Sequence, residues 1–290
     1  MNRKNFIKGT LLTGLAAILS PKLIKAETAK KSTYDQLLDQ VGFNHLPNKQ
    51  KKTMNSVLHK ADSRGKADHG WLNSYHSFSF ANYHNPNRMN FGVLRVLNDD
   101  KVAANRGFEK HPHDNMEIVS IPLEGNLEHK DSIGTISVIK EGEVQVMSAG
   151  TGIFHSEMNK SEDQEVKFLQ IWVFPKTKDV EPRYDQISIR DIEKQNKFYQ
   201  VLSPNEDDQG VWIHQDAWFH LGKFEQGSKD TYEIKKTGNG VYVFVLEGSV
   251  DIDGQKLDRR DGYGIWDLEK FNLEASSDAR VLLMEVPMQL

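Results

Sequence analysis

The sequence contains no cysteine. This absence excludes disulfide bonds, iron–sulfur clusters, thiolate zinc sites, type 1 copper and a cysteine nucleophile. Any metal must therefore be held by histidine, aspartate, glutamate or other oxygen ligands. The chain has 290 residues, of which 38% are hydrophobic and 27% charged. It can bury the core of one large domain or of two domains of ordinary size.

A long hydrophobic run is also missing. No stretch of 18 apolar residues occurs, so we expect no permanent membrane span of the usual length. A shorter apolar stretch, 11–19, follows the basic pair Arg3-Lys4 and precedes the small residue Ala26. This order is typical of a secretory signal, and the basic pair resembles a twin-arginine signal with lysine in second place. We predict an export signal over residues 1–26 and a periplasmic or extracellular protein. The alternative is an amphipathic N-terminal helix on a cytoplasmic protein.

Basic side chains are concentrated at the N-terminal end. Residues 1–60 hold eleven Lys and Arg against three Asp and Glu, which leaves 26 basic and 38 acidic side chains, net −12, in residues 61–290. Because a nucleic-acid-binding protein usually presents a basic face, we expect no nucleic-acid partner. We interpret the polar, lysine-rich residues 27–60 as a tether that contains at most one short helix, over 35–42.

Short β-type runs dominate the chain from residue 70 onward. They lie at 91–97, 117–123, 135–139, 143–147, 168–174, 242–246, 248–252 and 281–286. The turns between them carry Gly or Asp-Gly, a pattern that is typical of a β-sandwich or barrel. Helix signals are few, and the best one in this part of the chain covers 191–199. We therefore predict an all-β fold with few short helices.

The β-rich part contains an internal repeat. The triplet Leu-Glu-Gly occurs at 123–125 and again at 246–248, which is 123 residues later. Downstream of each triplet, a basic residue, an acidic residue and a glycine follow one another, at 140–142 and at 260–262. Two matches in the same order favour a duplicated β-domain. Chance is the alternative, because such triplets are common where strands enter turns.

Two pairs of ligand-type residues have strand spacing: His111 with His113, and His155 with Glu157. Side chains at i and i+2 share one face of a strand, so neighbouring strands could combine the pairs into a cage of three nitrogens and one oxygen. Such a cage suits Fe, Mn, Co, Ni, Cu or Zn. Glu117 has the same strand parity as His113. Its possible roles are metal ligand, buried ion-pair residue or partner that orients an imidazole, and we expect the last.

The other histidines and several aromatic residues are given structural roles. Surface positions are expected for His69, His84 and His129. A hydrogen bond within the 71–83 segment is expected for His76, and the wall of the metal pocket is its alternative place. Core packing rather than substrate contact is expected for Trp71, Phe78, Phe80 and Trp172.

Four stretches resemble the pirin family of bicupins. They are 70–83 (GWLNSYHSFSFANY), 108–117 (FEKHPHDNME), 123–132 (LEGNLEHKDS) and 147–157 (MSAGTGIFHSE). The similarity extends from about residue 64 to the C-terminus. It implies two cupin domains, which we place at 61–180 and 181–290.

The resemblance also implies a single metal in the first cupin, held by His111, His113, His155 and Glu157. The repeat offset of 123 residues carries His111, His113 and Glu117 onto Ile234, Lys236 and Gly240, and no histidine follows His220. The second cupin is therefore expected to be degenerate, without metal ligands.

The resemblance implies one of two functions. Some pirins are flavonol 2,3-dioxygenases (quercetinases), and others are non-enzymatic transcriptional cofactors. We predict an exported dioxygenase with one divalent metal, Fe(II) before Mn, Co, Ni, Cu or Zn. It would act with dioxygen on a flavonol or a related enolic phenol, with Glu157 as catalytic base and the metal as Lewis acid. Two alternatives stay open. One is a non-catalytic metal or redox sensor that binds a partner protein, which export disfavours, and the other is a cupin isomerase or stress-related protein of unknown substrate.

Overall fold

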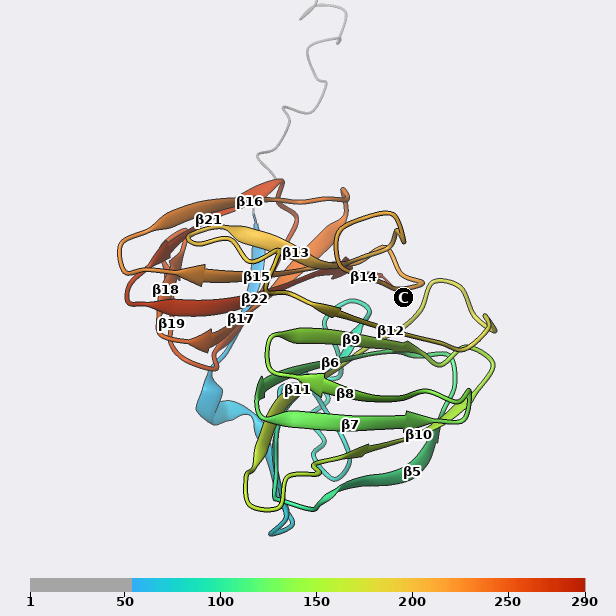
Figure 1. The fold of residues 1–290 in the computed structure, drawn as a ribbon. Coiled ribbons are helices and arrows are strands. Elements are labelled where there is room, and N and C mark those ends of the chain that lie inside the picture. Colours follow the sequence, from blue (N-terminus) through green and yellow to red (C-terminus); the bar gives the residue numbers. More distant parts are fainter. Residues whose placement is uncertain (1–53, 290) are drawn as a thin grey trace, which may run out of the picture. The chain divides into compact units, whose positions relative to one another are not determined.

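The computed structural model describes residues 54–289, which form 22 β-strands and one short 3₁₀ helix, η2 (Ala61–Ser63). The strands build two β-domains, coloured mainly green and orange-red in Figure 1, and they confirm the predicted all-β class. Within the described part, no helix is long and apolar enough to cross a membrane. The predicted export signal, the helix at 35–42 and most of the predicted tether lie outside these residues.

The N-terminal domain consists of one large and one small sheet. The large sheet has seven strands in the order β12 (Arg183–Ser188), β9 (Glu143–Ser148), β6 (Glu117–Glu124), β11 (Val166–Val173), β4 (Leu94–Val102), β3 (Leu72–His76) and β2 (Gly65–Asp68). The small sheet has four strands in the order β5 (Gly107–His113), β10 (Ile153–Met158), β7 (Asn126–Asp131) and β8 (Ile136–Lys140).

The C-terminal domain repeats this division. Its large sheet has seven strands in the order β1 (Asn55–His59), β20 (Gly262–Trp266), β17 (Asn239–Glu247), β22 (Ala279–Pro287), β15 (Trp218–Phe224), β13 (Phe198–Ser203) and β14 (Val211–Trp212). Its small sheet has four strands in the order β16 (Lys229–Glu233), β21 (Lys270–Ala275), β18 (Val250–Ile252) and β19 (Gln255–Leu257).

The two domains correspond in the five central strands of the large sheet and in all four strands of the small one. The end strands differ, because β2 is antiparallel to β3 and β14 is parallel to β13. The strand that ends in the Leu-Glu-Gly repeat is third in each large sheet, β6 in one and β17 in the other. The glycines that follow, Gly125 and Gly248, have φ angles of 78° and 75°, in the left-handed region that favours glycine. A Cβ atom at Gly248 would also lie 1.9 Å from the Asp278 carbonyl oxygen. The repeat therefore marks equivalent turns, and the predicted duplication is confirmed.

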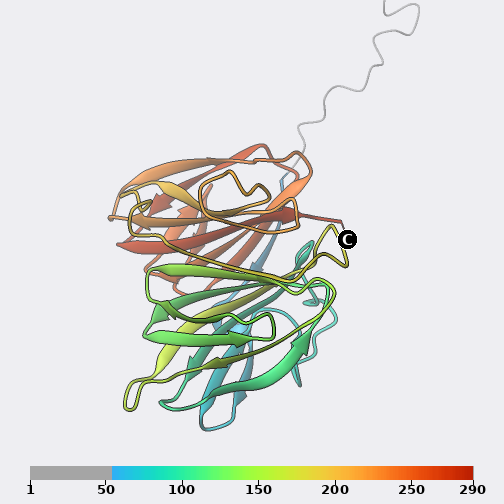
Figure 2. The same ribbon diagram turned by 45° about the vertical axis from the view of Figure 1, so that its right-hand side comes forward.

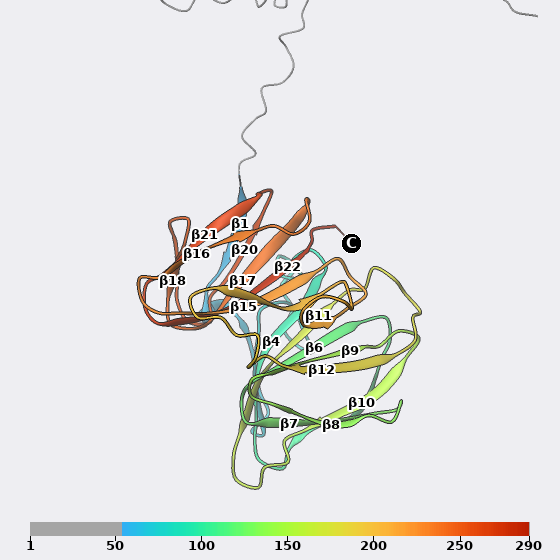
Figure 3. The same ribbon diagram turned by 45° about the horizontal axis from the view of Figure 1, so that its top comes forward.

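The first strand of each large sheet lies outside the predicted limits of its domain. β1 precedes the N-terminal domain in sequence but pairs with β20 of the C-terminal domain, as Figure 3 shows. β12 follows the predicted boundary at residue 180 but pairs with β9 of the N-terminal domain. Two predicted limits are thereby corrected: residues 55–59 are a strand and not tether, and the N-terminal domain extends through Ser188.

β1 was not predicted as a strand because few of its side chains face inward. Val57 packs against the large core, and His59 is buried with its Nδ1 atom 2.9 Å from Tyr242 Oη. Asn55, Ser56 and Leu58 are exposed. Backbone pairing with β20, rather than a hydrophobic pattern, keeps this segment in the sheet.

The helix predicted over 191–199 does not form. Ile192 packs against the core, Asn196 has a φ angle of 59°, and β13 begins at Phe198. A left-handed residue ends a right-handed helix. The ring of Phe198 lies 5.0 Å from that of Phe224, so tertiary packing has overridden a weak local helix preference.

The cores of the two domains are filled to different extents. One cluster joins the two large sheets, with Leu97 and Val119 from the N-terminal domain and Phe244 and Met284 from the C-terminal domain; Figure 2 shows the domains packed against each other. A second cluster, which includes Phe271, fills the C-terminal domain between its sheets. The clusters between the N-terminal sheets are smaller, and space remains there for a cavity.

Candidate metal centre

Three histidines lie together on two neighbouring strands. His111 and His113 are at the end of β5, and His155 lies on β10, where its backbone pairs with His111. The ring centroids are 4.4 Å apart for His111 and His155, and 4.9 Å apart for the other two pairs. One nitrogen from each ring lies within 4.8 Å of the others, which is compatible with one shared ion at metal–nitrogen distances of about 2.0–2.1 Å. The strand spacing thus predicted this histidine cluster.

Glu157 follows on β10 but is displaced by a bulge. The pairing of β10 with β5 shifts register between His155 and Glu157, and the Glu157 carboxylate forms a second close group with His155 and His129. Its oxygens accept hydrogen bonds from Ser120 Oγ at 3.0 Å and from Gln170 Nε2 at 2.6 Å. Burial raises the pKa of Glu157 to about 7. The carboxylate therefore borders the histidine cluster through His155.

The nitrogen atoms of the cluster fit a divalent transition metal. Both ring nitrogens of His155 are buried without a hydrogen-bond partner among the described residues, a state that folded proteins rarely leave uncompensated. Burial lowers the pKa of His155 to about 2 and that of His113 to about 4, so both rings stay neutral, as metal ligands must. His111 Nδ1 lies 2.7 Å from the Glu109 carbonyl oxygen. Donation to that oxygen leaves His111 Nε2 as the ligand atom.

His129 belongs to this site, and its predicted surface position is wrong. The side chain is fully buried, and its ring centroid lies 5.3 Å from that of His155 and 4.7 Å from that of Tyr184. Its Nε2 atom lies 3.1 Å from Asp131 Oδ2. Leu127 and His129 are both buried on β7. The i, i+2 relation to an apolar residue was therefore the signal that could have placed His129 inside.

A cavity of about 270 Å³ adjoins the cluster. Its lining includes the apolar side chains of Leu72, Phe80, Phe108 and Trp172 and the polar side chains of Ser74, His76, Asn98, Asp100 and Gln170, together with His111, His113 and Glu157. The Trp172 ring lies 4.9 Å from that of His113 and 5.4 Å from that of Phe80. Phe80 is thus a cavity residue, which corrects its prediction as core. Trp172 lines the cavity and also packs against a core cluster, and Phe78 is core as predicted.

The polar side of the cavity contains a second buried carboxyl group. Burial raises the pKa of Asp100 to about 7, although a hydrogen bond from Ser74 acts in the opposite direction. His76 also lines the cavity, and its Nδ1 atom is buried without a partner among the described residues. The structure therefore supports the pocket-wall alternative for His76. The remaining two histidines of the surface prediction, His69 and His84, are exposed as expected.

Glu117 does not have the contacts that an orienting role requires. A turn at Asn115, with a φ angle of 44°, separates β5 from β6, and the two strands belong to different sheets. Strand parity is therefore not carried over from His113. The Glu117 carboxylate accepts a hydrogen bond from Ser148 Oγ at 2.7 Å, and burial raises its pKa to about 7 even though the Arg183 guanidinium is near. Its partners in the described part of the chain are thus not ligand imidazoles.

The C-terminal domain fills the corresponding space with apolar side chains. Both groups of three side chains in residues 54–289 that could hold a metal ion lie in the N-terminal domain. The strands β16 and β21, which correspond to β5 and β10, carry no histidine and contribute Tyr232, Phe271 and Leu273 to the core.

Both halves of the chain match known families. The Pirin family model matches residues 57–173, and the model for the quercetinase C-terminal cupin domain matches residues 200–286. A protein of Escherichia coli (strain K12) named "Quercetin 2,3-dioxygenase" is 42% identical over 230 residues, which cover 79% of this chain and 98% of that protein. A "Pirin-like protein" of Caulobacter vibrioides is 39% identical over 225 residues, which cover 77% of this chain and 96% of that protein.

Solved structures agree with these matches. The bacterial pirin YhhW from Escherichia coli, in complex with nickel(II), has a TM-score of 0.76 and 41% sequence identity, and the match covers 80% of this chain and 99% of that one. The histidine cluster lies within the part matched by the Pirin model. Agreement in sequence and fold over nearly the whole length of these relatives shows that the chain belongs to the pirin family.

Proposed function

We propose that this protein is a metal-dependent dioxygenase that acts on a flavonol of the quercetin type or on a related enolic phenol. The observation that carries the proposal is the position of the histidine cluster, with the unpaired nitrogens of His155, against a cavity with aromatic walls. The relatives named quercetin 2,3-dioxygenase, at 42% identity over most of the chain, support an oxidoreductase of this kind.

The proposed ligands of a single divalent metal are His111, His113, His155 and Glu157. Three imidazoles and a carboxylate suit several first-row metals. We propose Fe(II), and the nickel(II) complex of a related pirin makes nickel the first alternative to test. When bound, the metal would supply Lewis-acid chemistry that lowers the pKa of a substrate hydroxyl, and it would supply a reaction centre for dioxygen.

Glu157 is the proposed catalytic base. Its carboxylate lines the cavity, is held by Ser120 and Gln170, and in the metal-free protein has a pKa raised to about 7 by burial. A base with a pKa near the working pH can both accept and return a proton. Trp172 and Phe80 offer flat apolar surfaces to an aromatic substrate and keep water from the site.

Oxygen uptake tests the proposal. Natively purified protein should consume dioxygen when quercetin is added. Protein stripped of metal should not, and Fe(II) should restore the rate better than Ni(II) or Mn(II). Equal restoration by all three metals would contradict the choice of iron. The absence of uptake from fully metal-loaded protein would contradict the dioxygenase itself.

We also propose that the protein is exported, on the basis of the basic start, the apolar stretch and Ala26 in residues 1–26. Cell fractionation with N-terminal sequencing should find a mature protein that begins near Glu27, outside the cytoplasm. An intact Met1 on a cytoplasmic protein would contradict export.

A further inference from the structure

Two adjacent strands line the cavity with a strip of polar side chains. Ser74 and His76 on β3 pair with Asp100 and Asn98 on β4, respectively, and all four side chains line the cavity. None is more than 3% exposed. We call these four residues the polar strip. It lies on the large sheet, whereas His111, His113 and His155 lie on the small one.

Three atoms of the polar strip are buried without a partner among the described residues. They are His76 Nδ1, Asn98 Oδ1 and Asp100 Oδ1. The Ser74 hydroxyl donates to the Asp100 carboxyl, so one oxygen of that group is satisfied and the other is not. Buried polar groups of folded proteins almost always have a partner. Since these groups line a cavity, a ligand that enters it can supply the missing partners in place of water.

The chemistry of the strip selects the kind of ligand. The oxygens of Asn98 and Asp100 accept hydrogen bonds, so the ligand must bring donors. No lysine or arginine occurs among the described residues that line this cavity, whereas two buried carboxyl groups, Asp100 and Glu157, do. A ligand that brings hydroxyl donors therefore suits the strip, whereas an ionised carboxylate brings none. The apolar walls at Trp172 and Phe108 suit a flat aromatic body.

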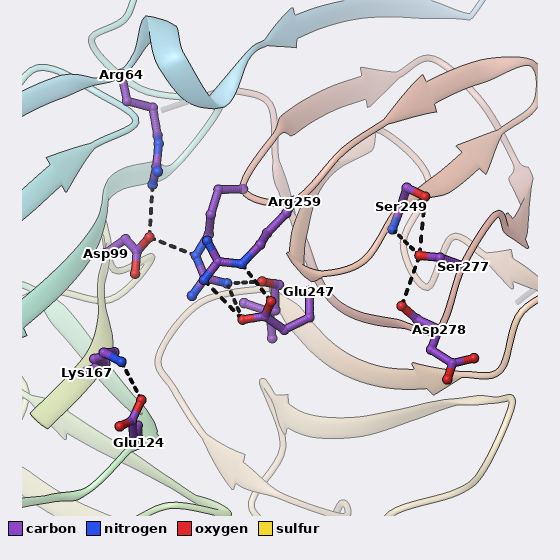
Figure 4. A network of polar contacts seen from close by, with 11 residues as sticks. Arg64, Asp99, Glu124, Lys167, Glu247, Ser249, Arg259, Ser277 and Asp278 are labelled. Carbon is purple, nitrogen blue, oxygen red and sulfur yellow. Dashed lines mark hydrogen bonds and ion pairs between the residues drawn. The ribbon is translucent and has the colours of Figure 1, made fainter.

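The strand that carries the acceptors is fixed from its other face. Between Asn98 and Asp100, Asp99 forms an ion pair with Arg64 at 3.2 Å, as Figure 4 shows. Asp99 forms a second ion pair with Arg260 of the C-terminal domain at 2.8 Å. Asp99 does not line the cavity. It therefore offers a control for changes to the same strand that leave the polar strip intact.

We infer that the polar strip binds the phenolic hydroxyl groups of the substrate that lie away from the metal, with Asn98 and Asp100 as the acceptors that determine specificity. This inference rests on the proposed function, because it assigns one end of the flavonol to the metal. The preferred substrate is then a neutral polyhydroxylated aromatic molecule. A flavonol whose single hydroxyl is used at the metal binds more weakly, because it leaves the strip unpaired.

Anaerobic equilibrium binding to the metal-loaded protein tests this inference without turnover. The wild type should bind quercetin at least about tenfold more tightly than 3-hydroxyflavone, as expected for hydrogen bonds to buried polar and charged groups. In Asp100→Leu this preference should fall below about threefold, mostly through weaker quercetin binding. Asp100→Asn keeps the shape of the side chain and should give an intermediate preference, so it decides the matter if the leucine variant does not fold. Asp99→Asn should keep the wild-type preference.

Oxygen uptake measured on the same proteins separates this inference from the proposed function. The role of the strip would be overturned if the wild type bound quercetin and 3-hydroxyflavone with equal affinity. It would also be overturned if both Asp100 variants kept the wild-type preference for quercetin, even if quercetin is turned over. A preference that depends on Asp100 without any oxygen uptake would support the strip and contradict the dioxygenase. Failure of the wild type to bind either flavonol would overturn both.

Discussion

Glu117→Gln gives a prediction that tests the location of Glu117 directly. The carboxyl group is 1% exposed, and its pKa is raised from 4.5 to about 7 by burial. The folded protein therefore holds this proton over a pH range in which the unfolded chain has released it. The contribution of this carboxyl group to the free energy of unfolding is fully present below about pH 4.5 and is lost as the pH rises through 7. Glutamine does not titrate, so the variant should become progressively more stable relative to the wild type across this range.

The magnitude follows from the size of the pKa shift. One pKa unit corresponds to about 1.4 kcal/mol, so the wild type should lose about 2–3 kcal/mol relative to Glu117→Gln between pH 5 and pH 8. The Ser148 hydroxyl, 2.7 Å from the carboxylate, can still donate to the amide oxygen of glutamine. Urea unfolding of the metal-free proteins at several pH values measures the difference. Glu124→Gln is the control, because Glu124 lies on the same strand and is exposed.

Two results would refute this reasoning. Free energies of unfolding that stay parallel from pH 5 to pH 8 would show that the Glu117 carboxyl is not kept protonated by burial. A loss of metal affinity of about tenfold or more in Glu117→Gln, typical when a partner that orients a ligand is removed, would restore the orienting role that the structure argues against.

His111→Ala and His155→Ala should each lose most of the bound metal in elemental analysis. Full metal occupancy in both variants would contradict the ligand assignment. Glu157→Gln should slow the oxygen uptake with quercetin by about 10²–10⁴-fold, as expected for loss of a general base. Metal content must be measured alongside, because loss of rate with metal retained supports the base, whereas loss of both supports only ligation. Phe271→Ala should destabilise the protein by about 3–5 kcal/mol, because it empties part of the C-terminal core. The exposed Phe154 is its control, where alanine should change stability by no more than about 0.5 kcal/mol, and equal effects of the two changes would contradict the assigned core.

Most of the β-structure could be predicted from local patterns. The run predicted at 143–147 is strand β9 (Glu143–Ser148), and the run at 117–123 is strand β6 (Glu117–Glu124), because both runs are rich in β-branched and other apolar residues and turns with glycine follow them. β1 and β12 could not be assigned to their sheets in this way. β1 pairs with β20 of the C-terminal domain, and β12 pairs with β9 of the N-terminal domain. Pairing between strands that are distant in the sequence leaves no periodic signal in it.

The site was predictable where it depends on strand alternation. The approach of His111, His113 and His155 follows from i, i+2 spacing on paired strands. Glu117 was misplaced because a turn ends the strand before it. The cavity walls were also missed, because Trp172 and Phe80 come together only in the tertiary structure. The sequence does not distinguish an aromatic residue that packs in a core from one that lines a substrate cavity.

The most direct test of the central claim is the stoichiometry of the reaction in natively purified protein. With one metal per chain, the protein should consume one molecule of dioxygen for each quercetin and release one molecule of carbon monoxide, as flavonol 2,3-dioxygenation requires. Gas-phase detection of carbon monoxide alongside oxygen uptake measures both quantities. Metal-loaded protein that leaves quercetin unchanged, or that oxidises it without releasing carbon monoxide, would contradict the assignment.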